Sequence, residues 1–388
     1  MRKGKRPVRI ARAVMDLAPY KVSNQKPLFM KQSENPLKLD WNESTISPSP
    51  KVAEAIFEAA TSYNLNWYPD VEARELRQKL SDYTGLETEY ISCFGGSDMA
   101  LEYIVRTYLE SGTTVLMSAP TYDNFRVYAQ STGATVIQVT YDNPFEPDVS
   151  RLLNSISART RLVYICNPNN PTGGMFSEEE IRTLLEKALQ CMFVIDEAYF
   201  EFCGETAANL VKSFNNIIVA RSFSKAFGLA ALRIGYVLSD PENLEYIHRI
   251  KVGKNVNLLG QIAAMAALED EQYTLDYVSE INDSKEILTE EMEKLGFEFV
   301  ITPANFMLVK FSNPAKGIEQ LENVGIFIRD RSTVPQLEGF VRISIGTLEQ
   351  TVRLIEALGN MNDQITGKDS EPAEAIVSHR NLRETVGV

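Results

Sequence analysis

Two runs of the sequence decide the fold class: MFVIDEAY at residues 192–199 and RSFSKAFGLAALR at residues 221–233. In the first run, the carboxylate of Asp196 ends a short apolar stretch, and a phenol follows it at Tyr199. In the second run, Lys225 lies among hydroxyls and small residues. Short, continuously apolar stretches are typical of parallel strands that are buried on both faces, and ligands bind at the carboxyl ends of such strands. The two runs therefore predict an α/β fold with a site at its strand ends.

The rest of the chain extends this pattern in both directions. Apolar runs that predict further strands occur at residues 114–117, 135–139, 161–166, 217–220 and 232–237. Segments with helical periodicity, such as 72–84 and 177–190, lie between several of these runs. This alternation predicts a mostly parallel sheet flanked by helices.

The pattern changes after the last of these runs, which predicts a division into domains. We expect a large domain at residues 51–260 and a smaller α+β domain at 261–362, which begins with a long, charged helical stretch up to residue 295. Residues 1–50 are interpreted as an arm that joins the small domain. Residues 363–388 are polar and lack aromatic residues, so we expect a loose tail there.

Composition and charge exclude several classes of function. The 388 residues include 39 basic and 52 acidic side chains, and the resulting charge of −13 disfavours nucleic acid and anionic membranes as partners. No apolar run approaches the ~18 residues of a membrane span, and the basic N-terminus has no apolar segment of a secretion signal. With two histidines and no CxxC pair, we expect neither a metal site nor a histidine-based triad. Isolated cysteines favour a reducing compartment, and we expect the cytoplasm.

Side-chain chemistry narrows the function further. The amine of Lys225 can react with an aldehyde and later act as a base, although a single lysine is more often a surface charge. Two hydroxyls, Ser222 and Ser224, and the guanidinium of Arg233 suit a phosphate dianion. As an acid at the end of a strand, Asp196 suits pairing with the protonated ring nitrogen of a bound cofactor, although loop acids and helix caps are common in that position.

Three further parts of the sequence suit contacts with a bound cofactor. The glycine turn before a predicted helix, with Gly96, Ser97 and Asp98, favours an anion site, but it also suits an ordinary helix cap. Tyr122, after a predicted strand, is equally consistent with ring stacking on a cofactor and with a core aromatic. Asn170 lies in the turn NPNNPTG at residues 167–173, which by itself is a weak signal.

Together these runs resemble the class I/II aminotransferases, pyridoxal 5′-phosphate (PLP) enzymes of fold type I, and above all the histidinol-phosphate aminotransferases. The resemblance covers residues 15–360 approximately. It is also carried by LAPY at 17–20, WYPD at 67–70, Asn305-Phe306, GIFIRD at 325–330 and VRISIG at 341–346.

The resemblance implies PLP as the cofactor and a homodimer with shared active sites. It implies that Lys225 binds the cofactor covalently, with Asp196 at the ring nitrogen and with Tyr199 and Asn170 at the ring oxygen. Tyr122 would stack on the ring. The implied phosphate ligands are Gly96, Ser97, Asp98, Ser222, Ser224, Arg233 and, from the neighbouring subunit, Tyr68. The implied substrate-binding residues are Tyr20, Asn42, Lys254, Arg329 and Arg342.

Two departures from the family concern the substrate. The family usually has an asparagine-rich run resembling NxNEN, but residues 40–44 read DWNES and keep only Asn42 and Glu43. Lys254 stands where the family often has a tyrosine that faces the substrate phosphate of the partner subunit. A lysine also favours an anionic substrate, but with a different shape. Both changes leave the cofactor chemistry intact and leave the substrate open.

The leading interpretation is amino transfer. An amine or amino acid, possibly phosphorylated and resembling histidinol phosphate, would exchange its amino group with a 2-oxo acid such as 2-oxoglutarate. The alternative is a PLP-dependent decarboxylase of a phosphorylated amino acid, similar to the threonine-phosphate decarboxylases, because the same motifs serve both reactions. A non-catalytic PLP-binding sensor is disfavoured by the acidic charge and by the lack of a DNA-binding domain.

Overall fold

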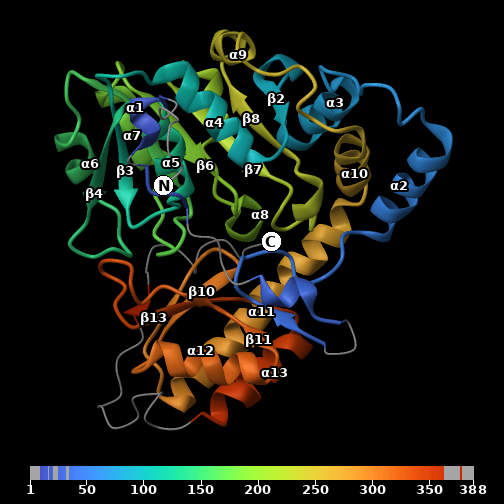
Figure 1. Ribbon diagram of the computed structural model, residues 1–388, viewed down its shortest axis with the longest axis vertical. Helices are drawn as coiled ribbons and strands as arrows, with labels where there is room; N and C mark the ends of the chain where they lie inside the picture. The colour runs from blue at the N-terminus through green and yellow to red at the C-terminus, as the bar shows by residue number, and fades with distance from the viewer. Residues whose placement is uncertain (1–8, 16, 21–24, 32–34, 362–375, 378–388) are drawn as a thin grey trace, which may run out of the picture.

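The computed structural model describes residues 9–361, apart from 16, 21–24 and 32–34, and also residues 376–377. Figure 1 shows two parts, each with helices packed around a sheet, and α11 (Glu271–Leu295) running from the upper part into the lower part. Within the described residues, no helix combines the length and the apolar character needed to cross a membrane.

The upper part is built on a sheet that has seven strands among the described residues, in the order β2-β8-β7-β6-β5-β3-β4. β8 is antiparallel to both of its neighbours, and the other pairings in this sheet are parallel. The predicted fold class, α/β with a mostly parallel sheet, is therefore confirmed. The strands are β2 (Ile91–Phe94), β3 (Thr114–Ala119), β4 (Thr135–Thr140), β5 (Thr160–Cys166), β6 (Met192–Asp196), β7 (Ile217–Ser222) and β8 (Gly235–Ser239).

Helices cover both faces of this sheet because its central strands are apolar on both sides. In β6, Phe193 and Ile195 pack into one buried cluster and Val194 packs into the other. Helices α4 and α5 contribute to the Val194 cluster, whereas α3, α7 and α10 contribute to the Phe193 cluster. The helices are α2 (Pro50–Ser62), α3 (Arg74–Thr84), α4 (Ser97–Tyr108), α5 (Asn124–Ser131), α6 (Val149–Asn154), α7 (Glu178–Lys187), α8 (Phe200–Cys203), α9 (Pro241–His248) and α10 (Leu258–Leu268).

The lower part has a smaller sheet with the strand order β12-β13-β10-β9-β14 among the described residues. β1 (Leu37–Lys38), from the N-terminal arm, pairs in parallel with β11 (Ile326–Phe327) nearby. α11 packs against α13, and both contribute to the buried cluster beneath the small sheet. The remaining elements are α1 (Arg12–Met15), β9 (Phe299–Ile301), β10 (Phe306–Lys310), α12 (Pro314–Asn323), β12 (Arg329–Asp330), β13 (Phe340–Ser344), α13 (Leu348–Gly359) and β14 (Ile376–Val377).

Several details differ from the sequence-based expectations. The strand expected at 232–237 begins only at Gly235, because Arg233 adopts a left-handed conformation with φ of 52°. The helical stretch expected from residue 260 to 295 is two helices, interrupted between α10 and α11. α10 packs on α2 and α3, so we propose the division between the two parts at 269–270 and not at 260. The expected loose tail lies outside the described residues except at β14, which pairs with β9 and is therefore ordered strand.

Candidate active site

Asp196 is the last residue of β6 and is 3% exposed. Parallel pairing places it beside Cys166, at the carboxyl ends of two adjacent strands. Its Oδ2 accepts a hydrogen bond of 2.8 Å from the hydroxyl of Tyr164, and its Oδ1 accepts one of 3.2 Å from the N–H of Ala198. Burial raises the pKa of Asp196 to about 6, although the Tyr164 bond opposes the rise. A carboxylate buried in this way is stabilised by an adjacent cation, such as a protonated ring nitrogen.

Lys225 lies in the turn that follows β7, facing the same strand ends. Its Nζ donates a hydrogen bond of 2.9 Å to the carbonyl of Trp41 and lies 5.8 Å from the centre of the Tyr199 ring. Burial, followed by the positive charge of Arg342, lowers the pKa of Lys225 to about 8. An appreciable fraction of this amine is therefore uncharged at slightly alkaline pH, and the uncharged amine is the form that attacks an aldehyde.

Tyr199 is held by two amides. Its hydroxyl oxygen accepts hydrogen bonds of 3.0 Å from the Nδ2 atoms of Asn42 and Asn170. Burial raises the pKa of Tyr199, so the hydroxyl keeps its proton and has it available to donate. Asn42 is fully buried, and its backbone N–H donates to Ser344. The structure thus places the side chain of Asn42 against the hydroxyl of Tyr199, and its predicted role in substrate binding stays a prediction.

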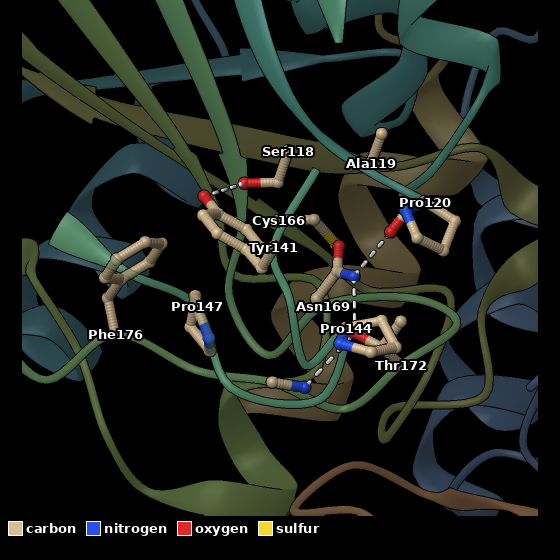
Figure 2. A pocket seen from close by; sticks show the side chains of 11 residues that line it. Ser118, Ala119, Pro120, Tyr141, Pro144, Pro147, Cys166, Asn169, Thr172 and Phe176 are labelled. Atoms are coloured by element: carbon tan, nitrogen blue, oxygen red, sulfur yellow. Dashed lines mark hydrogen bonds between the residues drawn. The ribbon is translucent and has the colours of Figure 1, made fainter. Parts of the chain in front are cut away.

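The three asparagines of the turn at residues 167–173 have different hydrogen-bond partners. Asn167 bonds the backbone of Phe176 in both directions, at 2.8 and 2.9 Å. Asn169 donates from Nδ2 to the carbonyl of Pro120 at 2.9 Å and to Thr172 Oγ1 at 2.7 Å. Figure 2 shows the two bonds of Asn169 around a small pocket beside the turn. They tie the turn to the end of β3 and leave Asn170 directed at Tyr199.

A cradle of small and basic groups lies at the N-terminus of α4. Gly96 caps this helix with φ of +93°, which favours glycine, and a Cβ there would displace the Arg233 guanidinium, which would lie 2.6 Å away. Arg233 NH1 lies 3.5 Å from Ser224 Oγ, and the N–H of Ser224 donates to Ser222 Oγ at 3.0 Å. The N–H groups and positive dipole of a helix N-terminus attract anions. Apart from Tyr68, the expected phosphate ligands thus meet in one place, with the backbone of Ser97 beside them.

Asp98 has a different role from the other residues of the cradle. Its Oδ1 accepts a hydrogen bond of 2.7 Å from the hydroxyl of Tyr122, and its Oδ2 lies 3.4 Å from Arg233 NH2. A carboxylate would repel a phosphate, so the side chain of Asp98 positions Tyr122 and Arg233 while its backbone remains at the helix terminus. The ring of Tyr20 lies 6.1 Å from that of Tyr122, which brings the arm to the same edge of the site.

Arginines gather on the small-sheet side of the site. Arg342 is 3% exposed and donates bonds of 2.6 Å from NH1 to Asn170 Oδ1 and from NH2 to the carbonyl of Asp40. Its Nε is buried and has no hydrogen-bond partner among the described residues. Arg329 pairs directly with Arg342 across β12 and β13. The two predicted substrate arginines therefore lie together, and Arg342 reaches the Tyr199 side through Asn170.

Tyr68 and Lys254 are placed differently from the other predicted residues. Both side chains are exposed, and Lys254 Nζ lies 3.7 Å from the centre of the Tyr68 ring. They form a cation–π pair on the surface of the chain.

Sequence reasoning missed three contributors to the site. Tyr164 lies in an apolar strand and stacks on Phe125 with ring centres 3.9 Å apart, so its pattern is that of a core aromatic. The carbonyl of Trp41 gives no sequence signal, because any residue supplies a carbonyl. Arg331, whose charge interacts with those of Arg329 and Arg342, was missed because it follows the strand that contains Arg329, where a basic residue is expected to face solvent.

These groups fit PLP. The cradle of Gly96 and Arg233 suits its phosphate, and the buried carboxylate of Asp196 suits its ring nitrogen. Tyr199 and Asn170 offer donors for its ring oxygen, and Lys225 offers an amine with a lowered pKa. The fit rests on chemistry and placement: a glycine at the N-terminus of α4 that lets the Arg233 guanidinium approach the backbone, and a buried carboxylate that lacks a cationic partner in the hydrogen bonds given above.

Known proteins match the chain over most of its length. A sequence model for aminotransferase class I and II matches residues 33–358. The dihydroxyacetone phosphate transaminase Cj1437c of Campylobacter jejuni is 40% identical over 351 residues, which is 89% of this chain and 95% of that protein. A histidinol-phosphate aminotransferase of Dehalococcoides mccartyi is 34% identical over 340 residues, which is 87% of this chain and 93% of that protein.

A solved structure agrees with the sequence matches. The histidinol-phosphate aminotransferase of Sinorhizobium meliloti, crystallised in complex with PLP, superposes with a TM-score of 0.81 at 28% sequence identity, covering 90% of this chain and 96% of that one. Together with the residues at the strand ends, these matches confirm the predicted family, the predicted enzyme class and PLP as the cofactor. The chain belongs to the class I and II aminotransferases.

Proposed function

We propose that this aminotransferase moves an amino group between a small phosphorylated ketone or amine and a 2-oxo acid such as 2-oxoglutarate. The observation that carries the proposal is the group of arginines beside Asn170, in which Arg342 keeps a buried Nε with no partner among the described residues. An unpaired buried donor on a cation favours an anionic ligand. The matched relatives named above act on phosphorylated compounds, dihydroxyacetone phosphate and histidinol phosphate.

The chain's own residues supply the proton handling. Bound PLP supplies an electron-withdrawing ring that makes the substrate's Cα–H bond acidic. Lys225, with a pKa lowered to about 8, would take up and return that proton at its Nζ. The carboxylate of Asp196 keeps the ring nitrogen protonated. Tyr199, with Asn42 and Asn170 donating to its oxygen, directs its own proton toward the ring oxygen.

A single-turnover experiment tests the substrate class. Dihydroxyacetone phosphate is added to the protein in its pyridoxamine form, and histidinol phosphate is added to the protein in its PLP form, without a second substrate. We expect the absorbance of the cofactor to change rapidly with at least one of them and slowly with dihydroxyacetone or histidinol. Conversion by glutamate alone, with no response to either phosphorylated compound, would keep the aminotransferase and discard the phosphorylated substrate.

The same preparation tests the decarboxylase alternative, which no contact among the described residues favours over amino transfer. O-phosphothreonine is added to the PLP form, and carbon dioxide is measured. Amino transfer predicts pyridoxamine phosphate as the product and no carbon dioxide. Release of carbon dioxide with the PLP form unchanged would replace our proposal by the alternative.

We further propose that two copies of the chain form a dimer with shared sites. Large apolar side chains are exposed along and after α2, including Phe57 at 72%, Trp67 at 69% and Tyr68 at 75%. Exposed apolar surface of this kind is typical of an interface. A second copy that covers it would bury Tyr68 and bring the Tyr68–Lys254 pair to the partner's phosphate cradle.

Subunit mixing tests the shared site. Lys225→Ala changes the cofactor side of one subunit, and Tyr68→Phe changes the residue that the other subunit would contribute to the same site. If the sites are shared, mixed dimers of the two inactive or weakened variants contain one site with both changes and one site with neither, and about a quarter of the wild-type activity returns on mixing when equal amounts exchange freely. No recovery, together with a monomeric mass in sedimentation, would contradict the dimer.

A further inference from the structure

Arg331 shares a face of the small sheet with the two arginines already assigned to the substrate. Its backbone N–H donates to the carbonyl of Phe340 at 3.1 Å, which continues the antiparallel pairing beyond β12. Side chains two residues apart on a strand, and those directly opposite across an antiparallel pair, lie on one face. Arg329 and Arg331 are two residues apart, and Arg329 is opposite Arg342. The three guanidiniums therefore form one group, here called the arginine cluster.

The acidic residue between the two arginines points elsewhere. Asp330 is exposed, and its Oδ1 accepts hydrogen bonds from the N–H and the hydroxyl of Ser332, at 2.8 and 2.7 Å. It caps the turn after β12 and faces away from the arginine cluster. Asp330, the acidic residue next to Arg331 in the sequence, therefore does not compensate the charge of Arg331.

Charge and burial both indicate a site that is prepared for an anion. Burial lowers the pKa of Arg331, and the positive charges of Arg342 and Arg329 lower it further. The hydroxyls that act in the opposite direction are those of Tyr20 and Tyr199. Among the described residues, the Nε atoms of both Arg331 and Arg342 are buried without a hydrogen-bond partner. Like charges crowded in this way destabilise a protein unless a ligand compensates them.

We infer that Arg331 is a substrate-binding residue that completes, with Arg329 and Arg342, a three-guanidinium site for the phosphate of the substrate. This inference rests on the proposed phosphorylated substrate and deepens it. A phosphate monoester carries nearly two negative charges and several acceptor oxygens, whereas a carboxylate carries one charge and is satisfied by a single bidentate arginine. A third guanidinium therefore favours phosphate over carboxylate.

A structural role for Arg331 makes the opposite prediction for stability. An arginine that holds the fold together has its donors in use, and its removal lowers the melting temperature. Removal of one of three crowded cations relieves repulsion. In the absence of an anion, Arg331→Gln is therefore expected to melt at or above the temperature of the wild type.

The test uses PLP-loaded protein, so that the cofactor's own phosphate cradle is filled, and inorganic phosphate as the probe. Melting temperature and calorimetric affinity for phosphate are compared in the wild type, Arg331→Gln and Arg331→Lys, with chloride at matched ionic strength as the reference. Arg249→Gln is the control, because Arg249 is an exposed arginine on α9 paired with Glu245. Retention of PLP absorbance shows that each variant is folded.

We expect Arg331→Gln to bind phosphate about 10-fold or more weakly and to lose most of the stabilisation by phosphate, because a charge-assisted bond is removed. Arg331→Lys should lie between it and the wild type, and the control should match the wild type. Unchanged phosphate affinity in Arg331→Gln overturns the inference, whatever its melting temperature.

A separate measurement on the wild type shows whether the proposed function itself fails. In the wild type, kcat/KM is compared for each phosphorylated compound and its dephosphorylated form. If the wild type shows no preference for phosphate, the proposed substrate class is wrong. Direct phosphate binding by Arg331→Gln still decides the role of Arg331, because that measurement does not depend on the reaction.

Discussion

At the strand ends of the large sheet, Asp196, Tyr199 and Lys225 each have a hydrogen-bond partner within the chain. On the small sheet, Arg331 and Arg342 instead keep buried Nε atoms without a partner among the described residues. The cofactor side is therefore organised by the protein itself, whereas on the small-sheet side Arg342 bonds Asn170 and Asp40 through its other nitrogens and two buried Nε donors remain for a ligand. This difference teaches that changes on the cofactor side should act mainly on the rate of amino transfer, whereas changes in the arginine cluster should act mainly on the binding of anions.

The largest effect is expected from Lys225→Ala, which removes the amine at the centre of the cofactor side. A positioned base contributes typically 10²–10⁴-fold, so amino transfer should fall by about that factor or more. Lys285 is the matched control: burial also lowers its pKa to about 8, but its Nζ donates to the carbonyl of Thr302 inside the small part. Borohydride reduction followed by peptide mapping should find PLP on Lys225. Attachment to Lys285 would refute the assignment.

Asp196→Asn should separate activity from stability on the same side. Amino transfer should fall on the order of 10²-fold, because the ring loses its charged partner. Burial raises the pKa of this acid from 3.8 to about 6, so its ionised form costs stability above pH 6 and not below about pH 4. At pH 7 the cofactor-free variant should thus be roughly 2–3 kcal/mol more stable than the wild type.

Denaturant unfolding of the cofactor-free proteins at pH 4 and pH 7 measures this difference. The gain should be present at pH 7 and nearly absent at pH 4, where the wild-type carboxyl is largely protonated. Equal stability of the two proteins at pH 7 would mean that Asp196 is compensated by more than the Tyr164 bond.

Arg342→Met joins the two sides, because the charge of Arg342 helps to lower the pKa of Lys225 to about 8. Removing that charge should raise the pKa of Lys225, so the rate of PLP incorporation into the cofactor-free protein should rise with pH at a higher midpoint than in the wild type. At pH 7.5 we expect roughly a several-fold slower incorporation. Stopped-flow absorbance across pH 6–10 measures it.

Arg331→Gln is the matched control for this experiment, because Arg331 is not among the charges that shift the pKa of Lys225 most. The pH midpoint of PLP incorporation should be the same in Arg331→Gln as in the wild type, even though the phosphate affinity of the variant falls. A shift of equal size in both variants would show that the arginine cluster acts on Lys225 as one general charge.

The smallest effect is expected from Tyr164→Phe. The ring keeps its stacking on Phe125, and only the hydrogen bond to Asp196 is lost. Since that bond opposes the rise of the Asp196 pKa, its loss should raise the pKa further. A hydrogen bond to a carboxylate contributes about 1.5–3 kcal/mol, but only the part that differs between ground state and transition state acts on the rate, so we expect kcat to fall about 2- to 10-fold and its acidic limb to move to higher pH. An unchanged pH profile would contradict this role for Tyr164.

Much of the cofactor side was predictable from sequence because it follows from strand patterning. Asp196 ends an apolar run, so its place at the carboxyl edge of a parallel sheet follows from the run itself. Tyr164 was not predictable, because a tyrosine within an apolar strand is equally consistent with a core aromatic. The contact of Asn42 with Tyr199 was not predictable either, because it spans 157 residues of chain and no local pattern reports such a contact.

The sequence by itself determined the fold class and the enzyme family, and it predicted the residues of the cofactor side, because these depend on local order and on short, spaced motifs. The tertiary structure decided which charges meet. Arg331 lies near Arg342 only because β12 pairs with β13 in one register, and Arg342 reaches Asn170 only because the small sheet packs against the strand ends of the large one. Long-range pairing of this kind sets the balance of charge at the substrate end, and with it the anion that we propose this enzyme recognises.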